Sequence, residues 1–422
     1  MTSLAGQHTD ADLKATLAQL DSPQAWLMVA VSFVALFTVY GVAYSFGAFF
    51  KSMAHEFGAG PGATSAVFST TVFVWGVLGW PAGHLADRFG PRPIIIIGAI
   101  AIGVGLLMTA YIEHLWVAYL TYGIGVGVGI ACGYVPTVAV VGGWFLHRRT
   151  TALGIAVAGI GCGTLFVSPI AAALIQRLGW RHTFLVFGLV SATVLIGCAV
   201  VVKRPPVHVA VAPFNIREAI ATPAFRLLYL SSVLSSMGLF TPFVFLPAFA
   251  RDHGATEVAA ATLVGLIGGA SVVGRMGLGA LADRVGVVRL YRFCYLVVGL
   301  SFVLWLIANS YAVLVMFALI LGVGYGGYVA LSPAVLAHFY GTQRLGSVLG
   351  ALYTSGGIGV LMGPPVAGFI IGHSGYRWAI AFSLAAGMAA FLSLLPLDEK
   401  SQHAPASASV PPAVSPSLKG RG

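Results

Sequence analysis

One arginine lies deep inside an otherwise apolar stretch of the chain. Residues 258 to 282 read VAAATLVGLIGGASVVGRMGLGALA, and Arg275 is their only charged residue. Placing a charge at such a depth in a membrane costs about 3 kcal/mol or more, so these residues usually mark a substrate or ion pathway. The guanidinium has a rigid fork of donors that matches a carboxylate, and it does not lose its proton. Arg275 therefore predicts a binding site for an anion.

The countercharge of Arg275 is expected to come from the ligand. No Asp, Glu or His lies within the core of any apolar run, so the sequence offers no acid to pair with it there. The alternative is a structural arginine that is satisfied by backbone carbonyls or by a distant acid. Because one cation suits one carboxylate, we expect a small monocarboxylate anion.

The composition is that of a membrane protein. The chain has 422 residues, of which 58% are hydrophobic and 8% charged, whereas soluble domains carry roughly 25% charged residues. Apolar runs of about 20 residues, long enough to cross a bilayer, recur along nearly the whole sequence. We predict an all-α polytopic membrane protein with twelve transmembrane helices, near residues 25–50, 64–86, 93–112, 115–140, 150–175, 181–202, 225–250, 258–282, 289–309, 311–338, 345–371 and 377–396.

The basic and thiol residues exclude other classes. The net charge of +10 comes from residues between the apolar runs, so it indicates a lipid bilayer and not nucleic acid as the partner. The four cysteines, Cys132, Cys162, Cys198 and Cys294, lie inside apolar runs at unrelated spacings, which predicts neither disulfides nor a metal site. We expect no metal and no cofactor.

The predicted spans divide into two groups of six. We expect a cytoplasmic tail over residues 1–22, helix bundles over 23–202 and 225–396, a cytoplasmic linker over 203–224 and a disordered cytoplasmic tail over 397–422. Asp21-Ser22-Pro23 is a helix start, and no signal-peptide pattern precedes it. Sixteen Lys and Arg residues fall on the side of both termini and five on the other, which places the termini in the cytoplasm.

The second group repeats the first. Gly83, Asp87 and Arg88 belong to GHLADRFG, which returns 196 residues later as GALADRVG with Gly279, Asp283 and Arg284. Two parallel six-helix repeats around a central site are a transporter architecture. The glycine permits close helix approach, while the Asp and Arg lie where a helix end meets water. We expect these residues to latch a gate in the outward-open state.

The duplicated motif resembles that of the major facilitator superfamily over residues 25–396. Within it, Trp144-Phe145 followed by Arg148, Arg149 and Ala152 resembles the start of span 5 in monocarboxylate transporters and oxalate/formate antiporters. Residues 41–46, GVAYSF, resemble span 1 of the same group. By this resemblance Arg275 occupies the position of the carboxylate-binding arginine.

The resemblance also bears on the substrate. Members that handle dicarboxylates have a second cation in span 11, and the matching residues 350–356, GALYTSG, contain none. A monocarboxylate such as lactate or pyruvate is therefore favoured over oxalate.

Other residues are expected to line the pocket beside Arg275. Ser271 is one turn from Arg275 and shares its face. Further pocket residues, with an apolar wall and a polar tip or a hydroxyl, are expected to be Tyr40, Tyr44, Tyr119, Tyr325, Tyr328 and Ser332, with Tyr44 and Tyr325 first because their spans match the group.

These observations predict a secondary active transporter of the plasma (inner) membrane that works as a monomer and moves a small monocarboxylate with a proton. An anion entering alone works against about 2.3 kcal/mol per 100 mV, which favours proton symport. Glu257 and Asp252 are the candidate proton carriers, and the substrate's own carboxylate or a water is the alternative.

Other interpretations are an organic-anion exchanger and a membrane sensor without turnover. A membrane enzyme is disfavoured because no span holds a catalytic cluster.

Overall fold

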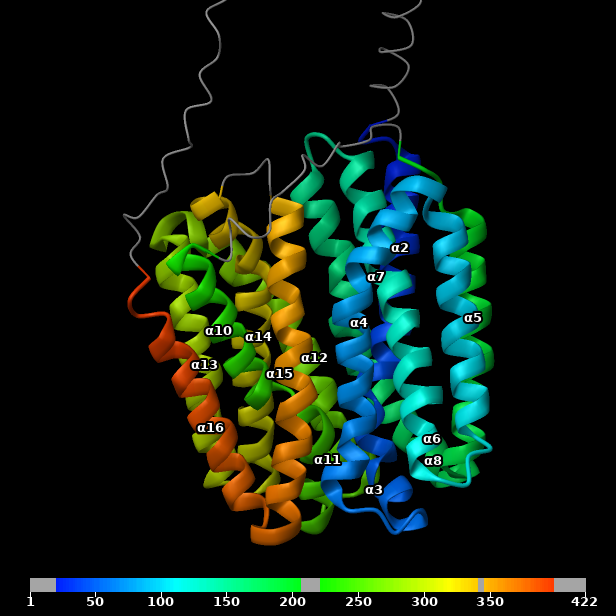
Figure 1. Cartoon of the computed structure of the whole chain (residues 1–422), viewed down its shortest axis with the longest axis vertical. Helices are drawn as coiled ribbons and strands as arrows, with labels where there is room; N and C mark the ends of the chain where they lie inside the picture. The colour runs from blue at the N-terminus through cyan, green and yellow to red at the C-terminus, as the bar shows by residue number, and fades with distance from the viewer. Residues whose placement is uncertain (1–19, 206–220, 341–344, 398–422) are drawn as a thin grey trace, which may run out of the picture.

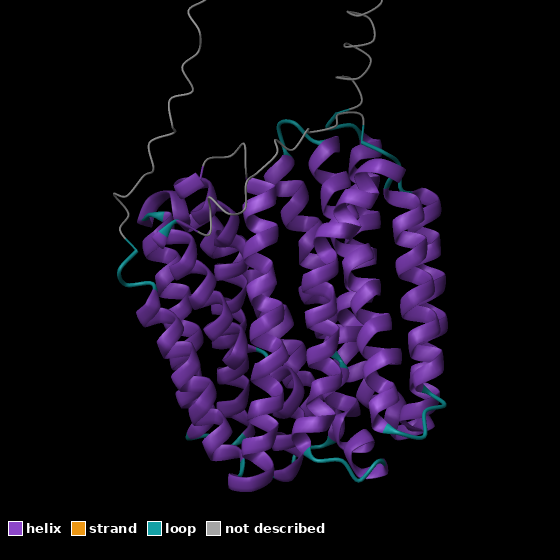
Figure 2. Cartoon of the chain, in the orientation of Figure 1, coloured by secondary structure: helices purple, strands orange, loops and turns teal. Residues whose placement is uncertain are grey.

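The computed structural model describes residues 20–205, 221–340 and 345–397, without the side chains of Ala280, Asp283 and residues 345–347. The described chain is helical throughout, and strands are absent from it (Figure 2). Most of the predicted N-terminal tail, most of the linker and the predicted C-terminal tail from residue 398 lie outside the described residues.

The N-terminal half is a bundle of long helices. Ser22 caps its first helix, since the Ser22 side chain accepts a hydrogen bond from the amide of Ala25 at 3.3 Å and Pro23 follows at the first helical position. Both features are those of a helix start, which confirms the prediction. The helices of this half are α2 (Pro23–Tyr44), α3 (Phe46–Glu56), α4 (Pro61–Phe89), α5 (Pro91–Thr109), α6 (Leu115–Ala118), the π-helical turn η1 (Tyr119–Ile124), α7 (Gly125–Trp144) and α8 (Arg149–Val201).

The C-terminal half is a second bundle beside the first (Figure 1). It contains α10 (Pro223–Leu239), α11 (Thr241–Asp252), α12 (Glu257–Val285), α13 (Val287–Leu306), α14 (Tyr311–Tyr340), α15 (Leu345–Ser374) and α16 (Tyr376–Ser393). We call the end of the molecule with Ser22, Gly90 and Gly286 the terminal side, and the opposite end, with Glu56 and Asp252, the distal side.

Eleven helices of the described chain are long and apolar enough to cross a membrane. One of them, α8, has 53 residues and would measure about 80 Å if straight, far more than a bilayer core of about 30 Å. The helical path breaks at Gly179, where φ is 80° and ψ is 161°. This glycine falls between the predicted spans 150–175 and 181–202. The count of twelve spans and the cytoplasmic placement of the termini stay predictions.

The internal repeat extends to the backbone of the turns. Among the described residues six glycines have positive φ, and they form three pairs separated by 196 residues: Gly58 and Gly254, Gly90 and Gly286, Gly179 and Gly375. Residues with a Cβ are disfavoured at such angles. The two halves therefore turn at the same places by the same backbone conformation.

Asp21, just before α2, is bound to the loop before α8. The Asp21 carboxylate accepts hydrogen bonds from the backbone amides of Leu146, His147 and Arg148 at 3.1 to 3.4 Å. The bond from the His147 amide holds the pKa of Asp21 below its ordinary value, because a carboxylate that accepts amide protons is stabilised in its charged form.

The turn at Gly179 gives a test of backbone strain alone, since a Cβ at this position would meet nothing within 4 Å. We expect Gly179→Ala to destabilise the purified protein by about 1 kcal/mol, measured as a lower melting temperature in detergent. Gly197 of the same helix is the control, because it also has open space but a helical φ. Gly197→Ala should be neutral or slightly stabilising. Equal effects of both substitutions would contradict the assignment of the turn to Gly179.

Candidate functional site

The guanidinium of Arg275 links the two halves of the molecule. Arg275 lies on α12, and its Nη1 donates a hydrogen bond to the backbone carbonyl of Val157 on α8 at 2.9 Å. Its Cζ lies over the ring of Tyr325, 5.8 Å from the ring centroid. The Nε atom is buried and makes no hydrogen bond with a described residue, and Arg275 forms no ion pair with a described acid. A carbonyl and an aromatic face thus stabilise the charge, but neither neutralises it.

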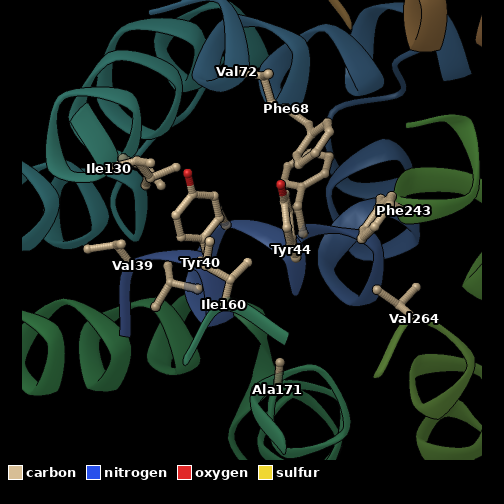
Figure 3. Close-up of a cluster of buried hydrophobic side chains, with 14 of the residues drawn as sticks. Val39, Tyr40, Tyr44, Phe68, Val72, Ile130, Ile160, Ala171, Phe243 and Val264 are labelled. Atoms are coloured by element: carbon tan, nitrogen blue, oxygen red, sulfur yellow. The ribbon is translucent and has the colours of Figure 1, made fainter. Parts of the chain in front are cut away.

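An aromatic layer covers the distal side of Arg275. It consists of Tyr44, Phe68, Phe240, Phe243 and Tyr325, all buried. Tyr44 packs on Phe243 with ring centroids 4.7 Å apart, and the hydroxyls of Tyr44 and Tyr325 are 3.4 Å apart. Figure 3 shows Tyr44 between Phe68 and Phe243. Because Tyr44 and Phe68 come from the N-terminal half and the other three from the C-terminal half, the layer closes the space between the halves.

Helices α8 and α12 cross at close range from the distal side down to Arg275. The Ser168 hydroxyl donates to the Ala261 carbonyl at 3.1 Å. Closer to Arg275 along both helices, a Cβ on Gly161 would lie 2.4 Å from the Gly268 carbonyl oxygen. Arg275 and the Val157 carbonyl are the next contact. Glycines at the crossing let the two backbones touch, as small residues do between membrane helices.

Beyond Arg275, toward the terminal side, the close packing ends. A Cβ at Gly154 on α8, or at Gly277 or Gly279 on α12, would meet nothing within 4 Å. The close crossing of α8 and α12 therefore extends from the distal side to the level of Arg275.

Several residues predicted to join Arg275 lie near it. Tyr44 and Tyr325 belong to the aromatic layer, and Tyr40 packs on Tyr44 with centroids 5.4 Å apart. Ser271 shares the α8-facing side of α12, but its hydroxyl donates to the Gly268 carbonyl at 2.7 Å and is fully buried. Its place is in the helix crossing.

Three other predicted residues lie further away. The ring centroids of Tyr328 and Tyr325 are 5.9 Å apart, but Tyr328 also packs on Tyr295 inside the C-terminal half. Ser332 donates to the Tyr328 carbonyl at 2.7 Å and lies deeper in that half. Tyr119 is not brought to Arg275: its hydroxyl donates at 2.9 Å to the carbonyl of Ala63, near the distal start of α4. Predicting which span holds a residue does not show how far along the membrane normal that residue lies.

Sequence reasoning missed two aromatic residues close to the site. Trp75 on α4 and Tyr134 on α7 make edge contacts with Tyr40, with ring centroids 5.7 Å and 5.9 Å apart. One signal was available: Tyr134 is the only tyrosine in the glycine-rich residues 125–144.

The duplicated motif lies at the terminal ends of α4 and α12. A Cβ on Gly83 would lie 2.9 Å from Val135 on α7, as expected for close helix approach, whereas Gly279 meets nothing within 4 Å. Asp87 and Arg88 are exposed and form no ion pair with a described residue. Arg284 is also exposed, and the side chain of Asp283 is outside the description.

The span-5 motif lies beside the terminal end of α7. Arg148 and Arg149 are exposed. A Cβ on Gly142 would lie 3.1 Å from the Arg149 Nη2, so that guanidinium packs on α7.

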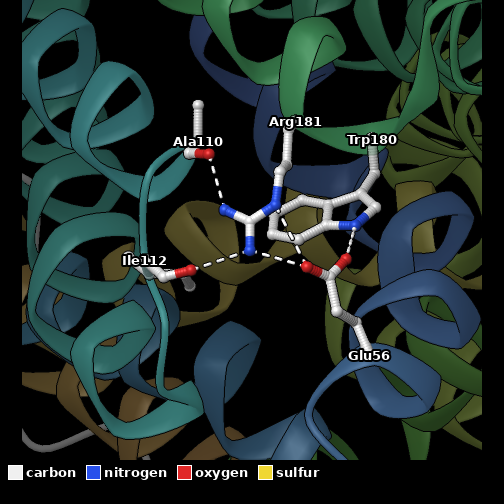
Figure 4. Close-up of polar contacts among 5 residues, drawn as sticks. All are labelled: Glu56, Ala110, Ile112, Trp180 and Arg181. Carbon is white, nitrogen blue, oxygen red and sulfur yellow. Dashed lines mark hydrogen bonds and ion pairs between the residues drawn. The ribbon is translucent and has the colours of Figure 1, made fainter.

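A polar network fastens the distal side of the N-terminal half. The Glu56 carboxylate accepts from Trp180 Nε1 at 2.5 Å and from Arg181 Nη2 at 2.6 Å. Arg181 also donates to the carbonyls of Ala110 and Ile112 at 2.7 and 2.8 Å (Figure 4). All these residues belong to one half, so the network joins α3, α8 and the chain after α5 within that half.

The corresponding residues of the C-terminal half have different ion-pair partners. Asp252 stands 196 residues after Glu56 and accepts from the Tyr376 hydroxyl at 3.1 Å, as Glu56 does from Trp180. Its ion-pair partner, however, is Lys51 of the other half. Arg377, the counterpart of Arg181, is exposed and has no ion pair with a described residue. The Lys51–Asp252 pair therefore joins the halves at the distal side.

The other candidate proton carrier, Glu257, pairs with Arg251 at 2.6 Å within the C-terminal half. Both candidate acids are thus engaged at the distal rim. In the described chain neither one contacts Arg275.

This fold and site define a polytopic helical transporter, and comparison with known proteins agrees. The family model for the Major Facilitator Superfamily matches residues 32–286 and 228–419. The chain therefore belongs to the major facilitator superfamily, and it is an integral, multi-pass membrane protein.

Within the superfamily the chain is similar to monocarboxylate transporters. It is 30% identical to monocarboxylate transporter 3 of Rattus norvegicus over 83% of this chain and 75% of that protein. It is 29% identical to monocarboxylate transporter 4 of Mus musculus over 79% of this chain and 75% of that protein. The fold is similar to that of a bacterial homologue of the human lysosomal transporter Spinster in an inward-facing, unoccupied conformation, with a TM-score of 0.72, 15% identity, and coverage of 89% of this chain and 98% of that one.

The glycine crossing gives a matched pair of substitutions on α8. We expect Gly161→Ala to destabilise the protein by about 1 to 3 kcal/mol, because its Cβ would overlap the α12 backbone. Gly154→Ala on the same helix has open space and should be tolerated. Melting temperatures in detergent measure both. A tolerated Gly161→Ala would contradict the close crossing.

Proposed function

We propose that the chain is a secondary active transporter of small monocarboxylates, of the lactate or pyruvate type, that works by alternating access in the plasma (inner) membrane with both termini cytoplasmic. Arg275 binds the carboxylate. The observation that carries the proposal is the buried Nε of Arg275. Among the described residues this atom has no hydrogen-bond partner, and the guanidinium has no ion-paired acid. The similarity to monocarboxylate transporters supports the same substrate class.

The two halves rock about the central site. In the described conformation, the aromatic layer and the Lys51–Asp252 pair close the distal side, and open space beside Gly154 and Gly279 favours access from the terminal side. With cytoplasmic termini, this state is inward-facing. The unpaired Asp87 and Arg88 agree with a latch that engages only in the outward-open state.

Proton symport is the proposed coupling, because it cancels the charge carried by the anion. The distal acids Asp252 and Glu257 are the protein's candidates, and the substrate carboxylate or a water is the alternative carrier. Obligatory anion exchange is the second candidate function. It is favoured by one observation, that Arg275 has no described acid in contact to relay a proton.

Uptake of labelled lactate into proteoliposomes tests the proposal. Symport predicts uptake that increases when the side from which lactate enters is made more acidic. Exchange predicts uptake only into vesicles preloaded with an anion. Uptake indifferent to the pH gradient would contradict symport, and ligand binding without any flux would indicate a sensor.

Substitution of Arg275 tests the site itself. We expect Arg275→Ala to lower lactate affinity by about 10- to 100-fold, the loss typical of a hydrogen bond to a charged group. Arg275→Lys should fall in between, because it keeps the charge but lacks the fork. Arg377→Ala is the control, since Arg377 is exposed and unpaired among the described residues. Unimpaired binding and uptake by Arg275→Ala would refute the site.

The distal ion pair gives a test of the conformational cycle. We expect Lys51→Ala or Asp252→Asn to shift the population toward an open distal side by no more than about fivefold, because exposed ion pairs contribute about 0.2–1 kcal/mol. Distances between spin labels on the distal ends of α3 and α11 measure the shift. The double variant Lys51→Asp with Asp252→Lys should restore the wild-type distances. If it opens the distal side further, the pair does not hold the halves together.

A further inference from the structure

Three cations meet where the terminal ends of α5 and α8 come together, outside the central site. Arg92 lies in the first turn of α5, and its Nε donates a hydrogen bond to the Val202 carbonyl, just after α8, at 2.7 Å. Lys203 and Arg204 follow directly. The Arg204 guanidinium lies against the turn between α4 and α5, because a Cβ on Gly90 would stand 2.5 Å from its Nε. We call Arg92, Lys203 and Arg204 the basic patch.

The backbone of the basic patch is held in place while its side chains face outward. The Lys203 amide donates to the Met28 Sδ on α2 at 3.3 Å, and the Lys203 carbonyl accepts from the Trp144 Nε1 on α7 at 3.4 Å. The side chains of all three patch residues are nevertheless exposed. The patch is therefore a fixed feature of the surface.

The described chain does not compensate the charge of the basic patch. None of the three cations forms an ion pair with a described acid. The acid nearest to Arg92 in the sequence is Asp87, and the adjacent Arg88 offsets its charge. With its Nε bound to the Val202 carbonyl, Arg92 keeps both Nη atoms without a hydrogen bond to a described residue. The patch can therefore accept an anion from outside.

Exposed apolar stripes lead from the basic patch along both helices. On α5, Arg92, Ile96 and Ile100 are spaced by four residues and share one exposed face. On α8, Ile196 and Val200 form a similar exposed stripe. The two helices pack against each other, and α5 lies at the outer edge of the molecule (Figure 1). From Arg92 to Ile100 the stripe is about 12 Å long, close to the roughly 15 Å of one leaflet's hydrocarbon.

We propose that the basic patch binds the headgroup of an anionic phospholipid, whose acyl chains lie along the exposed stripes of α5 and α8. Arginine donors match a phosphate group bidentately, and Arg92 and Arg204 supply two such forks, while Lys203 adds a point charge. Basic clusters at the ends of membrane helices attract anionic lipids. An occupant with a negative headgroup and apolar chains complements both parts of this surface. The site uses no residue of the central site and does not depend on the transported substrate.

The C-terminal half repeats the backbone contact but directs its arginine differently. Arg292 on α13 donates a hydrogen bond to the Leu397 carbonyl after α16, as Arg92 does to Val202. The Arg292 side chain is only partly exposed, however, and its Nε is buried. Of these two arginines, only Arg92 presents its guanidinium to the outside.

Native mass spectrometry of the purified full-length chain tests the proposal, with phosphatidylglycerol and phosphatidylcholine of the same acyl chains as probes. Wild type should bind phosphatidylglycerol about tenfold more tightly or better. Arg92→Gln, Lys203→Gln and Arg204→Gln should each lower that affinity about fivefold, the loss expected for one cation near the headgroup. Phosphatidylcholine affinity should stay nearly unchanged, because the choline compensates the phosphate. A general structural defect would lower both affinities together.

Arg226→Gln is the matched control. Arg226 is also an exposed arginine near the terminal end of a helix, α10, and its Nη2 also donates to a backbone carbonyl, that of Ala221, at 3.1 Å. The control should keep the wild-type ratio of the two lipid affinities. The inference is overturned if wild type binds both lipids equally, if all three patch variants keep the wild-type ratio, or if the control loses it to the same extent.

Soluble anions distinguish a lipid from an acidic protein segment or a free phosphate compound. Glycerol phosphate and a polyglutamate peptide carry the negative charge but lack acyl chains, so each should compete with phosphatidylglycerol at least tenfold more weakly than the lipid itself. If either one displaces the lipid as effectively as phosphatidylglycerol does, the patch is a site for soluble anions and the lipid assignment is overturned.

Discussion

The site depends on one positive charge, that of Arg275, which is held inside the protein without a negative partner among the described residues. A buried cation with no countercharge is costly, and the protein reduces that cost only in part. The Val157 carbonyl accepts one hydrogen bond and the Tyr325 ring offers its face, while Nε has no partner among the described residues. In the proposed function, a carboxylate supplies both the countercharge and the further acceptor.

In the proposed function, the position of that charge couples binding to the movement of the halves. Arg275 belongs to the C-terminal half and its acceptor to the other, at the terminal end of the glycine crossing. A ligand that competes for the guanidinium alters a contact between the halves. Such a ligand can shift the conformational equilibrium only by its differential affinity for the two states. A contact that exists in one state and is exchanged in the other provides that difference.

The sequence was informative where only one residue type suits a structural position, such as glycine in a turn, or where a residue type is rare in its surroundings. The motif duplicated at Gly83 and Gly279 predicted two repeated halves, and the glycines of the turns repeat at the same spacing of 196 residues. Arg275 was identified because a charge in an apolar helix is rare. Tyr44 and Tyr325 came from a family resemblance, and the structure brings them together.

Other parts of the site were beyond sequence reasoning for physical reasons. Tyrosines are frequent in membrane helices, and their role depends on the level at which helices cross. Tyr119 and Tyr134 belong to the same predicted span, yet only Tyr134 packs on Tyr40 beside the aromatic layer. The meeting of Lys51 with Asp252 depends on how the two halves are tilted. No local pattern encodes that tilt.

The most direct measurement is the distance between the substrate carboxylate and the guanidinium. Lactate labelled with ¹³C at the carboxylate and protein labelled with ¹⁵N at arginine allow dipolar recoupling by solid-state NMR in lipid. A charge-assisted contact predicts a ¹³C–¹⁵N distance of about 4 Å or less, and the signal should vanish in Arg275→Lys. Bound lactate with no short distance to an arginine, or a short distance that persists in Arg275→Lys, would contradict the account.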